Sequence, residues 1–155
     1  MQEFEVNFKV QMFIPGSNGI PGWISHQKNG SKITMRLPRY WYENDDFLGF
    51  ALCSLHVPLD IEEENRSLKC KLNFNNRAFL LVDDFWSKRN CERCLHGDES
   101  NQVWLIYYPK SKIPKKYHSN EYRTLNTSFS EYFGTEPVKV ERCGFHFIYA
   151  QEDYG

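Results

Sequence analysis

The chain has 155 residues, with nineteen Lys and Arg against twenty Asp and Glu and a formal net charge of −1. This balance supplies no global field for phosphate backbones or anionic lipid, so nucleic-acid and membrane binders are not favoured. A hydrophobic content of 41% is enough for one domain, residues 1–155, that buries its own core.

Short bursts of period-two alternation are the main structural signal, and they predict strands with one wet face. Aromatic residues make up 16% of the chain, which also favours strands. In chain order, the alternating segments are 4–10, 32–37 and 68–74.

Two segments, 47–57 and 103–108, are almost continuously apolar and predict strands covered on both faces. Near the end of the chain, the apolar positions change parity at about Arg142, which predicts a β-bulge. No stretch has a sustained helical period. Roughly eight strands with frequent turns predict an all-β fold, a two-sheet antiparallel β-sandwich of jelly-roll or immunoglobulin-like type.

Three weakly patterned stretches, 58–67, 83–100 and 110–120, are expected to be long connections, where binding residues usually lie. Each contains aromatic or charged side chains suited to a protein partner, with Phe85 and Trp86 as a possible hot spot. The candidate binding residues are Phe85, Trp86, Lys88 and Arg89 in one connection, Lys115, Lys116 and Tyr117 in another, and Glu62, Glu63 and Glu64 in a third.

The five cysteines are an odd number, and the first ten residues lack an apolar core of signal-peptide length. Reduced thiols in a cytosolic compartment are therefore expected. Cys91, Cys94 and His96 have the spacing of a zinc half-site, but structural zinc needs four ligands. Cys70 and Cys143 have the strand parity of core thiols, so no metal is predicted, and this half-site is kept as the one metal candidate.

Catalysis is not predicted. Cys53 and His56, like Cys143 and His146, are three residues apart, and strand residues at that spacing project to opposite faces. The chain has no phosphate-binding Gly loop and no Gly-x-Ser-x-Gly elbow. We therefore expect neither catalytic residues nor a cofactor.

Two other binding classes are alternatives. The basic run 110–118, with nearby tyrosines, would suit a zinc-supported nucleic-acid adaptor or a nuclear-import signal. Exposed tryptophans on a sandwich would suit a carbohydrate-binding module. Trp23, Trp41 and Trp104, however, lie beside turns or in apolar runs and are expected to be core anchors.

A series of motifs in fixed order, from about residue 12 to 151, resembles one family. The motifs are Ile14-Pro-Gly-Ser17, Ile20-Pro-Gly-Trp23, Gly30-Ser31-Lys-Ile33, Leu37-Pro38, Trp41-Tyr42, Phe47-Leu-Gly-Phe-Ala-Leu-Cys53, Gln102-Val-Trp-Leu-Ile-Tyr107 and Val138 to Gln151. This pattern is similar to the post-LRR, or C-terminal jelly-roll and immunoglobulin-like, domain of plant TIR-type nucleotide-binding leucine-rich-repeat receptors.

The resemblance implies a non-catalytic recognition domain that senses a pathogen effector protein together with the leucine-rich repeats of the same chain. It implies a location in the cytoplasm or the nucleus and no membrane partner. The matched residues shape turns and fill the sandwich, so they indicate the fold without marking a binding site.

Overall fold

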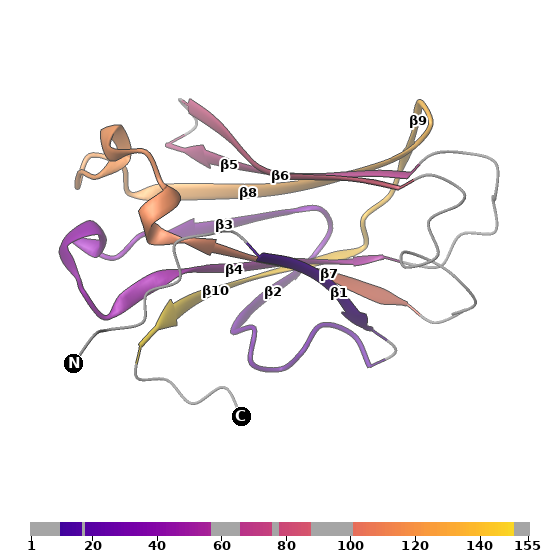
Figure 1. The fold of residues 1–155 in the computed structure, drawn as a ribbon, viewed down its shortest axis with the longest axis horizontal. Helices are drawn as coiled ribbons and strands as arrows, with labels where there is room; N and C mark the ends of the chain where they lie inside the picture. The colour runs from indigo at the N-terminus through magenta and orange to yellow at the C-terminus, as the bar shows by residue number, and fades with distance from the viewer. Residues whose placement is uncertain (1–9, 17, 57–65, 76–77, 88–100, 151–155) are drawn as a thin grey trace.

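The computed structural model describes residues 10–16, 18–56, 66–75, 78–87 and 101–150, with backbone alone for 78–87. These residues form ten strands and three short 3₁₀ turns and contain no α-helix, which confirms the predicted all-β fold class (Figure 1). The elements are β1 Val10–Pro15, β2 His26–Asn29, β3 Lys32–Arg36, η1 Trp41–Glu43, β4 Phe47–His56, β5 Arg66–Phe74, β6 Ala78–Ser87, β7 Gln102–Pro109, η2 Lys110–Lys112, η3 Lys115–Tyr117, β8 Thr124–Phe133, β9 Glu136–Val138 and β10 Arg142–Tyr149.

The strands form two antiparallel sheets that lie face to face (Figure 1). Sheet A has the order β1-β7-β4-β10-β2, and sheet B has the order β3-β8-β5-β6 with β9 beside β8. All the strand pairs are antiparallel, so the predicted two-sheet sandwich is confirmed. β2 and β3 are consecutive in the chain but belong to different sheets.

The core fills the space between the sheets because alternate residues of each strand point inward. On β4, Phe50 and Leu52 point into this space, where they meet Trp104 of β7 and Leu72 of β5. All four side chains have no exposed surface. Complete burial of side chains of this size supplies the main driving force for closing the sandwich.

The outer face of sheet A is apolar as well. Ala51 and Cys53 of β4 and Val103 of β7 lie beneath Ile20 and Ile24, which belong to the connection between β1 and β2. Both segments predicted to be covered on two faces, 47–57 and 103–108, correspond to β4 and β7, the neighbouring strands under this connection. The prediction is confirmed over residues 47–56, where the described part of β4 ends.

The bulge predicted at Arg142 is wrong. The parity changes there because β9 belongs to sheet B and β10 to sheet A, so the chain crosses between the sheets after Val138. The observed irregularities lie elsewhere. In β6, Val82 is an extra residue between the partners of Cys70 and Lys71 in β5. In β4, Leu48 is an extra residue between the partners of Ile148 and Tyr149 at the end of β10.

Candidate functional site

One end of the sandwich carries two long connections that brace each other, residues 38–46 and 110–123. We call this surface the η end because all three 3₁₀ turns lie in it. Asn120 Oδ1 accepts a hydrogen bond from the Tyr40 amide at 2.9 Å, and Lys110 Nζ donates to the Asn44 carbonyl at 2.8 Å. The two connections therefore form one preorganised surface.

Asn75, directly after β5, holds the connection 110–123 in place through its side chain. Its side chain donates to the Glu121 carbonyl at 2.6 Å and accepts from the amides of Arg123 and Thr124, each at 3.0 Å. Asn75 has a positive φ of 55°, a conformation that asparagine tolerates better than most residues. Asn75 thus holds the backbone of the connection in place where it leads into β8.

Aromatic rings form the floor of the η end. Tyr117 stacks on Phe74 with ring centroids 4.3 Å apart and planes 6° from parallel. Trp41 packs edge-on against His118 at 5.1 Å, and His118 Nε2 donates to the Ile113 carbonyl at 2.9 Å. Because Trp41 and Tyr117 are each only 2% exposed, they are part of the core and hold the connections in place.

Tyr40 stands out on this surface. It is 53% exposed and has φ 57°, a left-handed conformation that is unfavourable for a bulky residue. Its amide is held by Asn120, and its ring lies 6.3 Å from that of Tyr42. Sequence reasoning missed Tyr40, although the run of three aromatic residues after Arg39 marks the position.

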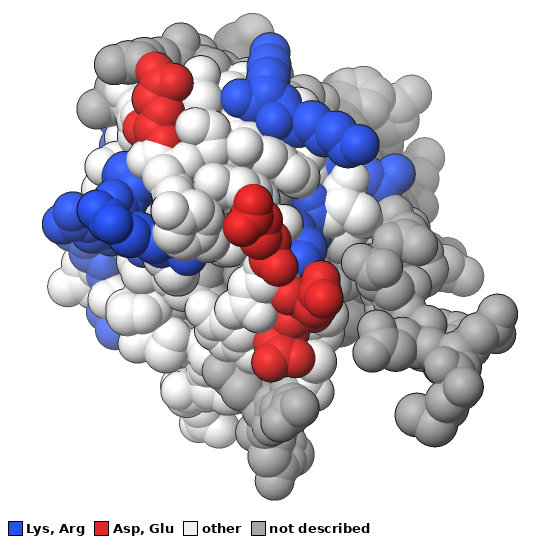
Figure 2. Space-filling view, turned by 90° about the vertical axis from the view of Figure 1, so that its left-hand side faces the viewer, with Lys and Arg blue, Asp and Glu red and all other residues white. Residues whose placement is uncertain are grey.

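Charged side chains are exposed on the same two connections. Exposed residues of the two connections include basic and acidic side chains, and Figure 2 shows them gathered in separate groups on this end of the molecule. The basic ones are Arg39, Lys112, Lys115 and Lys116, and the acidic ones are Glu43, Asp45, Asp46 and Glu121. The surface thus carries an exposed aromatic side chain, a residue type enriched at protein interfaces, together with exposed charges of both signs.

The structure places three predicted binding residues at the η end. Lys115 and Lys116 are exposed in η3, and the Lys116 Nζ lies 5.1 Å from the centroid of the Tyr117 ring. Tyr117, predicted to offer a stacking face, is instead buried against Phe74. Tyr117 is buried because it is the last residue of η3, a 3₁₀ turn that packs against the core.

Phe85 and Trp86 were predicted to lie in a loop, and this prediction is wrong. Both lie in strand β6, where they pair with Leu68 and Ser67 of β5. The acidic pair Asp83 and Asp84 lies in the same strand. The other predicted binding and metal residues lie outside the described residues. These are Glu62, Glu63, Glu64, Lys88, Arg89, Cys91, Cys94 and His96.

A buried polar network joins the two sheets. Ser54 Oγ lies 2.6 Å from His56 Nε2 on β4, and His56 Nδ1 is hydrogen-bonded to Glu131 Oε1 on β8. Arg66 of β5 donates to the same Glu131 oxygen at 3.3 Å. All four residues are at most 3% exposed. Sequence reasoning missed this network because its members come from three strands.

The network shifts the ionisation of its members. Burial lowers the pKa of His56, and the nearby Arg66 charge acts in the same direction, against the opposing effect of Glu131. Burial by itself would raise the pKa of Glu131, but the hydrogen bond from His56 and the charge and hydrogen bond of Arg66 hold that pKa below its ordinary value. At neutral pH the network therefore contains a neutral imidazole and a carboxylate paired with a guanidinium.

The order of atoms in Ser54, His56 and Glu131 matches that of a Ser-His-acid triad. Catalysis also requires that a substrate reach the nucleophile, and Ser54 has no exposed surface. The contacts of Glu131 with His56 and Arg66 link strands of both sheets.

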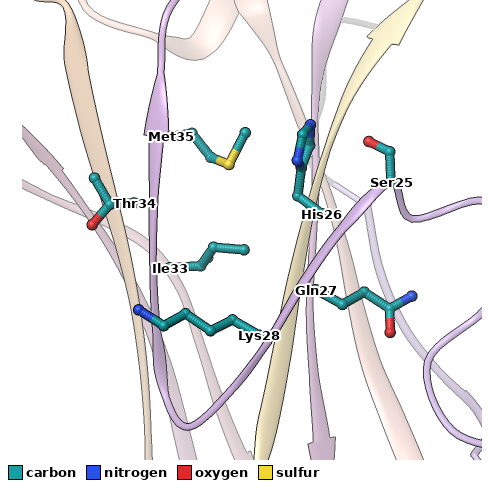
Figure 3. A pocket seen from close by; sticks show the side chains of 7 residues that line it. All are labelled: Ser25, His26, Gln27, Lys28, Ile33, Thr34 and Met35. Carbon is teal, nitrogen blue, oxygen red and sulfur yellow. The ribbon is translucent and has the colours of Figure 1, made fainter.

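A second surface feature is a shallow groove of about 370 Å³ between β2 and β3. Figure 3 shows His26 and Lys28 pointing from β2 toward Ile33 and Met35 of β3. Both strands are sheet edges, and an inward-pointing lysine on an edge strand is a common means of preventing pairing with other chains. The groove is therefore explained without a ligand.

Trp23, predicted to be a core anchor, is 37% exposed and contacts His146 edge-on at 5.7 Å. The prediction failed because the preceding turn runs over the outer face of sheet A, where Ile24 takes the buried position. Trp41 and Trp104 are core residues as predicted.

The fold and the braced connections define the class of protein: a two-sheet β-sandwich domain with a preorganised surface at one end. The chain belongs to the C-JID domain family, whose model matches residues 14–154. It is 33% identical, over 96% of its length, to the disease resistance proteins RUN1 and RPV1 of Vitis rotundifolia. It is 29% identical, over 93% of its length, to the disease resistance protein RPP2B of Arabidopsis thaliana.

The chain is thus a domain of the kind found in TIR-type plant disease resistance proteins. It spans only 12%, 10% and 14% of RUN1, RPV1 and RPP2B, respectively. In the part of the chain that the structure describes, no helix has the length and apolar character needed to cross a membrane.

Proposed function

We propose that this chain is the non-catalytic recognition domain of a plant immune receptor, and that it binds a pathogen effector protein through the η end. The observation that carries the proposal is Tyr40, an exposed aromatic residue held at a positive φ on a braced surface. Unfavourable backbone conformations that surrounding contacts maintain are typical of functional positions. Family membership supports a role in disease resistance.

The η end suits recognition because its hydrogen bonds order it before a partner arrives. Ordering interface residues during binding costs roughly 0.5–1.5 kcal/mol for each immobilised side chain, and a preorganised surface avoids part of that cost. Tyr40 would serve as the central anchor, while Lys115 and Lys116 would select an acidic patch on the partner. Phe85, Trp86, Lys88, Arg89, Glu62, Glu63 and Glu64 remain further candidates.

The leucine-rich repeats of the same parent chain are the second proposed partner, and we assign them to the outer face of sheet A. Met12 is 47% exposed and Trp23 is 37% exposed on this side, beside the half-buried Leu105 and Ile148. The outer face of sheet B, by contrast, carries Lys32, Arg36, Lys69 and Lys71. An apolar face opposite a polar one favours sheet A as the covered side. The parent receptor would act in the cytoplasm or nucleus.

Replacement of Tyr40 by Gly tests the proposal. Glycine adopts positive φ readily, so Y40G should leave the folded state as stable as the wild type or more so while removing the aromatic side chain. We expect the full receptor carrying Y40G to lose effector-triggered cell death. In a receptor that keeps Tyr40, K115E combined with K116E should weaken the response.

Tyr132 of β8 provides the matched control, because it is 37% exposed on a strand away from the η end. The Y132S receptor should respond as the wild type does. A full response from the Y40G receptor, with Y132S unchanged, would contradict the role of the η end. A glycan array and elemental analysis for zinc test the alternative carbohydrate-binding and zinc-supported nucleic-acid functions.

A further inference from the structure

The buried network of Ser54, His56, Glu131 and Arg66 lies where four strands end or begin. His56 is the last residue of β4 and pairs with Gln102, the first residue of β7. Arg66 is the first residue of β5 and pairs with Ser87, the last residue of β6. Glu131 thus holds together strand ends from both sheets through a single carboxylate oxygen.

The hydrogen bonds fix the tautomer of a neutral His56. An ionised Glu131 can only accept, so the His56 Nδ1 carries the hydrogen and donates it to the carboxylate. Nε2 then has no hydrogen and accepts the Ser54 hydroxyl hydrogen across 2.6 Å. The charges of Glu131 and Arg66 cancel, and His56 is neutral, so the buried network has no net charge.

Adding one proton would break this balance. A protonated imidazole would leave one uncompensated positive charge among residues that are at most 3% exposed, which is costly in the protein interior. It would also turn Nε2 into a donor facing a hydroxyl that must then accept. Among the described residues, the charged groups that act on His56 are Glu131 from β8 and Arg66 from β5, with the uncharged Ser54 on its own strand.

The opposite end of the sandwich is closed in another way. There, Trp41 packs against Phe47 and Phe47 against Phe147, while Tyr117 stacks on Phe74, and all these rings belong to or pack against the core between the sheets. Burial raises the pKa of Tyr108, a buried tyrosine at this end, to about 12, so it does not titrate in the acidic range. The histidine at this end, His118, is half-buried and donates to the Ile113 carbonyl, whereas His56 at the other end is buried.

We propose that Ser54, His56, Glu131 and Arg66 form a proton-sensitive latch between the sheets, and that uptake of a proton by His56 opens this end of the sandwich while the aromatic end stays packed. The latch couples the acidity of the surroundings to the freedom of the strand ends at β4, β5, β6 and β7. It does not depend on what the η end binds.

Hydrogen exchange of backbone amides in the 155-residue chain, followed by NMR at pH 7.5 and 5.5, tests the latch. After correction for intrinsic exchange, protection of residues 53–56 and 66–68 should fall about tenfold, since a histidine of pKa 6.5 in the open state is about 90% protonated at pH 5.5. The comparison uses amides of residues 47–50 and 72–74, at the aromatic end of the same two strands, that exchange by local fluctuation without global unfolding. Their protection should stay within about twofold, because these fluctuations leave His56 buried.

His56→Gln removes the titrating group while keeping an amide that can donate to Glu131 and accept from Ser54. In this variant, protection at the latch end should be the same at both pH values. His26→Gln, which changes an exposed histidine on β2, should keep the wild-type response. If H56Q fails to fold, the ratio between the two ends of the wild-type chain decides the question. The latch is refuted if wild-type protection falls equally at both ends, falls at neither, or keeps its pH dependence in a folded H56Q variant.

Discussion

At the scale of single residues, close backbone approaches determine which positions tolerate a side chain. Gly49 of β4 lies beside the end of β7, and a Cβ atom there would meet the Tyr108 carbonyl oxygen at 2.4 Å and the Pro109 Cα at 2.8 Å. These are backbone atoms of a paired strand and cannot rotate away. The glycine lets the central strand of sheet A run close to its neighbour at the start of β4.

Gly49→Ala should therefore lower the free energy of unfolding by about 1–3 kcal/mol, the range for a steric clash that shifts the backbone. Urea denaturation followed by tryptophan fluorescence measures the change. Gly22→Ala is the matched control, because a Cβ atom at Gly22 meets nothing within 4 Å. Equal stabilities of the two variants would contradict the close approach at Gly49.

At the scale of elements, the sequence predicted strands well where every inward position is apolar. β5 was predicted from Leu68, Cys70, Leu72 and Phe74, and all four are fully buried. β8 was missed because two of its buried positions, Thr127 and Glu131, are polar and break the apolar alternation. A carboxylate is buried there because histidine and arginine from other strands compensate it, and sequence spacing within β8 contains no sign of them.

The candidate site shows the same limit. The connection 110–120 was predicted as a binding loop, and the structure confirms it as a connection with Lys115 and Lys116 exposed. Its partner connection, with Tyr40, was not predicted as a site. The bracing between them depends on hydrogen bonds across about 80 residues of sequence, such as that from Tyr40 to Asn120. Local patterns reveal the residues but not this pairing.

The positions of Cys53 in β4 and Cys143 in β10 predict how slowly their thiols react. Burial raises the pKa of Cys53 to about 12, with a further contribution from Cys143, and burial raises the pKa of Cys143 to about 11. Both thiols should resist iodoacetamide at pH 8 in the folded chain, because the thiolate is the reactive form. Peptide mass spectrometry should find them modified only after denaturation. Rapid labelling of Cys53 in the folded chain would contradict its place under Ile20 and Ile24.

At the scale of the whole molecule, the sandwich is closed by rings at one end and by a polar network at the other. Apolar packing is insensitive to pH, but the network is not. The folded-state pKa of His56 is lowered, so below pH 6.5 the unfolded chain binds a proton that the folded chain does not. Linkage then requires that the free energy of unfolding decrease as pH falls from about 6.5 toward the folded-state pKa.

Glu131 changes the free energy of unfolding with pH in the same direction as His56. Its folded-state pKa is also lowered, so its contribution to stability is present above its ordinary pKa of 4.5 and is lost as pH falls through the folded-state value. Urea denaturation at pH 7.5, 6.0 and 5.0 should show stability that is nearly constant down to about 6.5 and then falls. The slope should approach about 1.4 kcal/mol per pH unit, the value for one proton. Stability that rises on acidification would show that His56 gains its proton more easily in the folded sandwich than in the unfolded chain, opposite to what its burial requires.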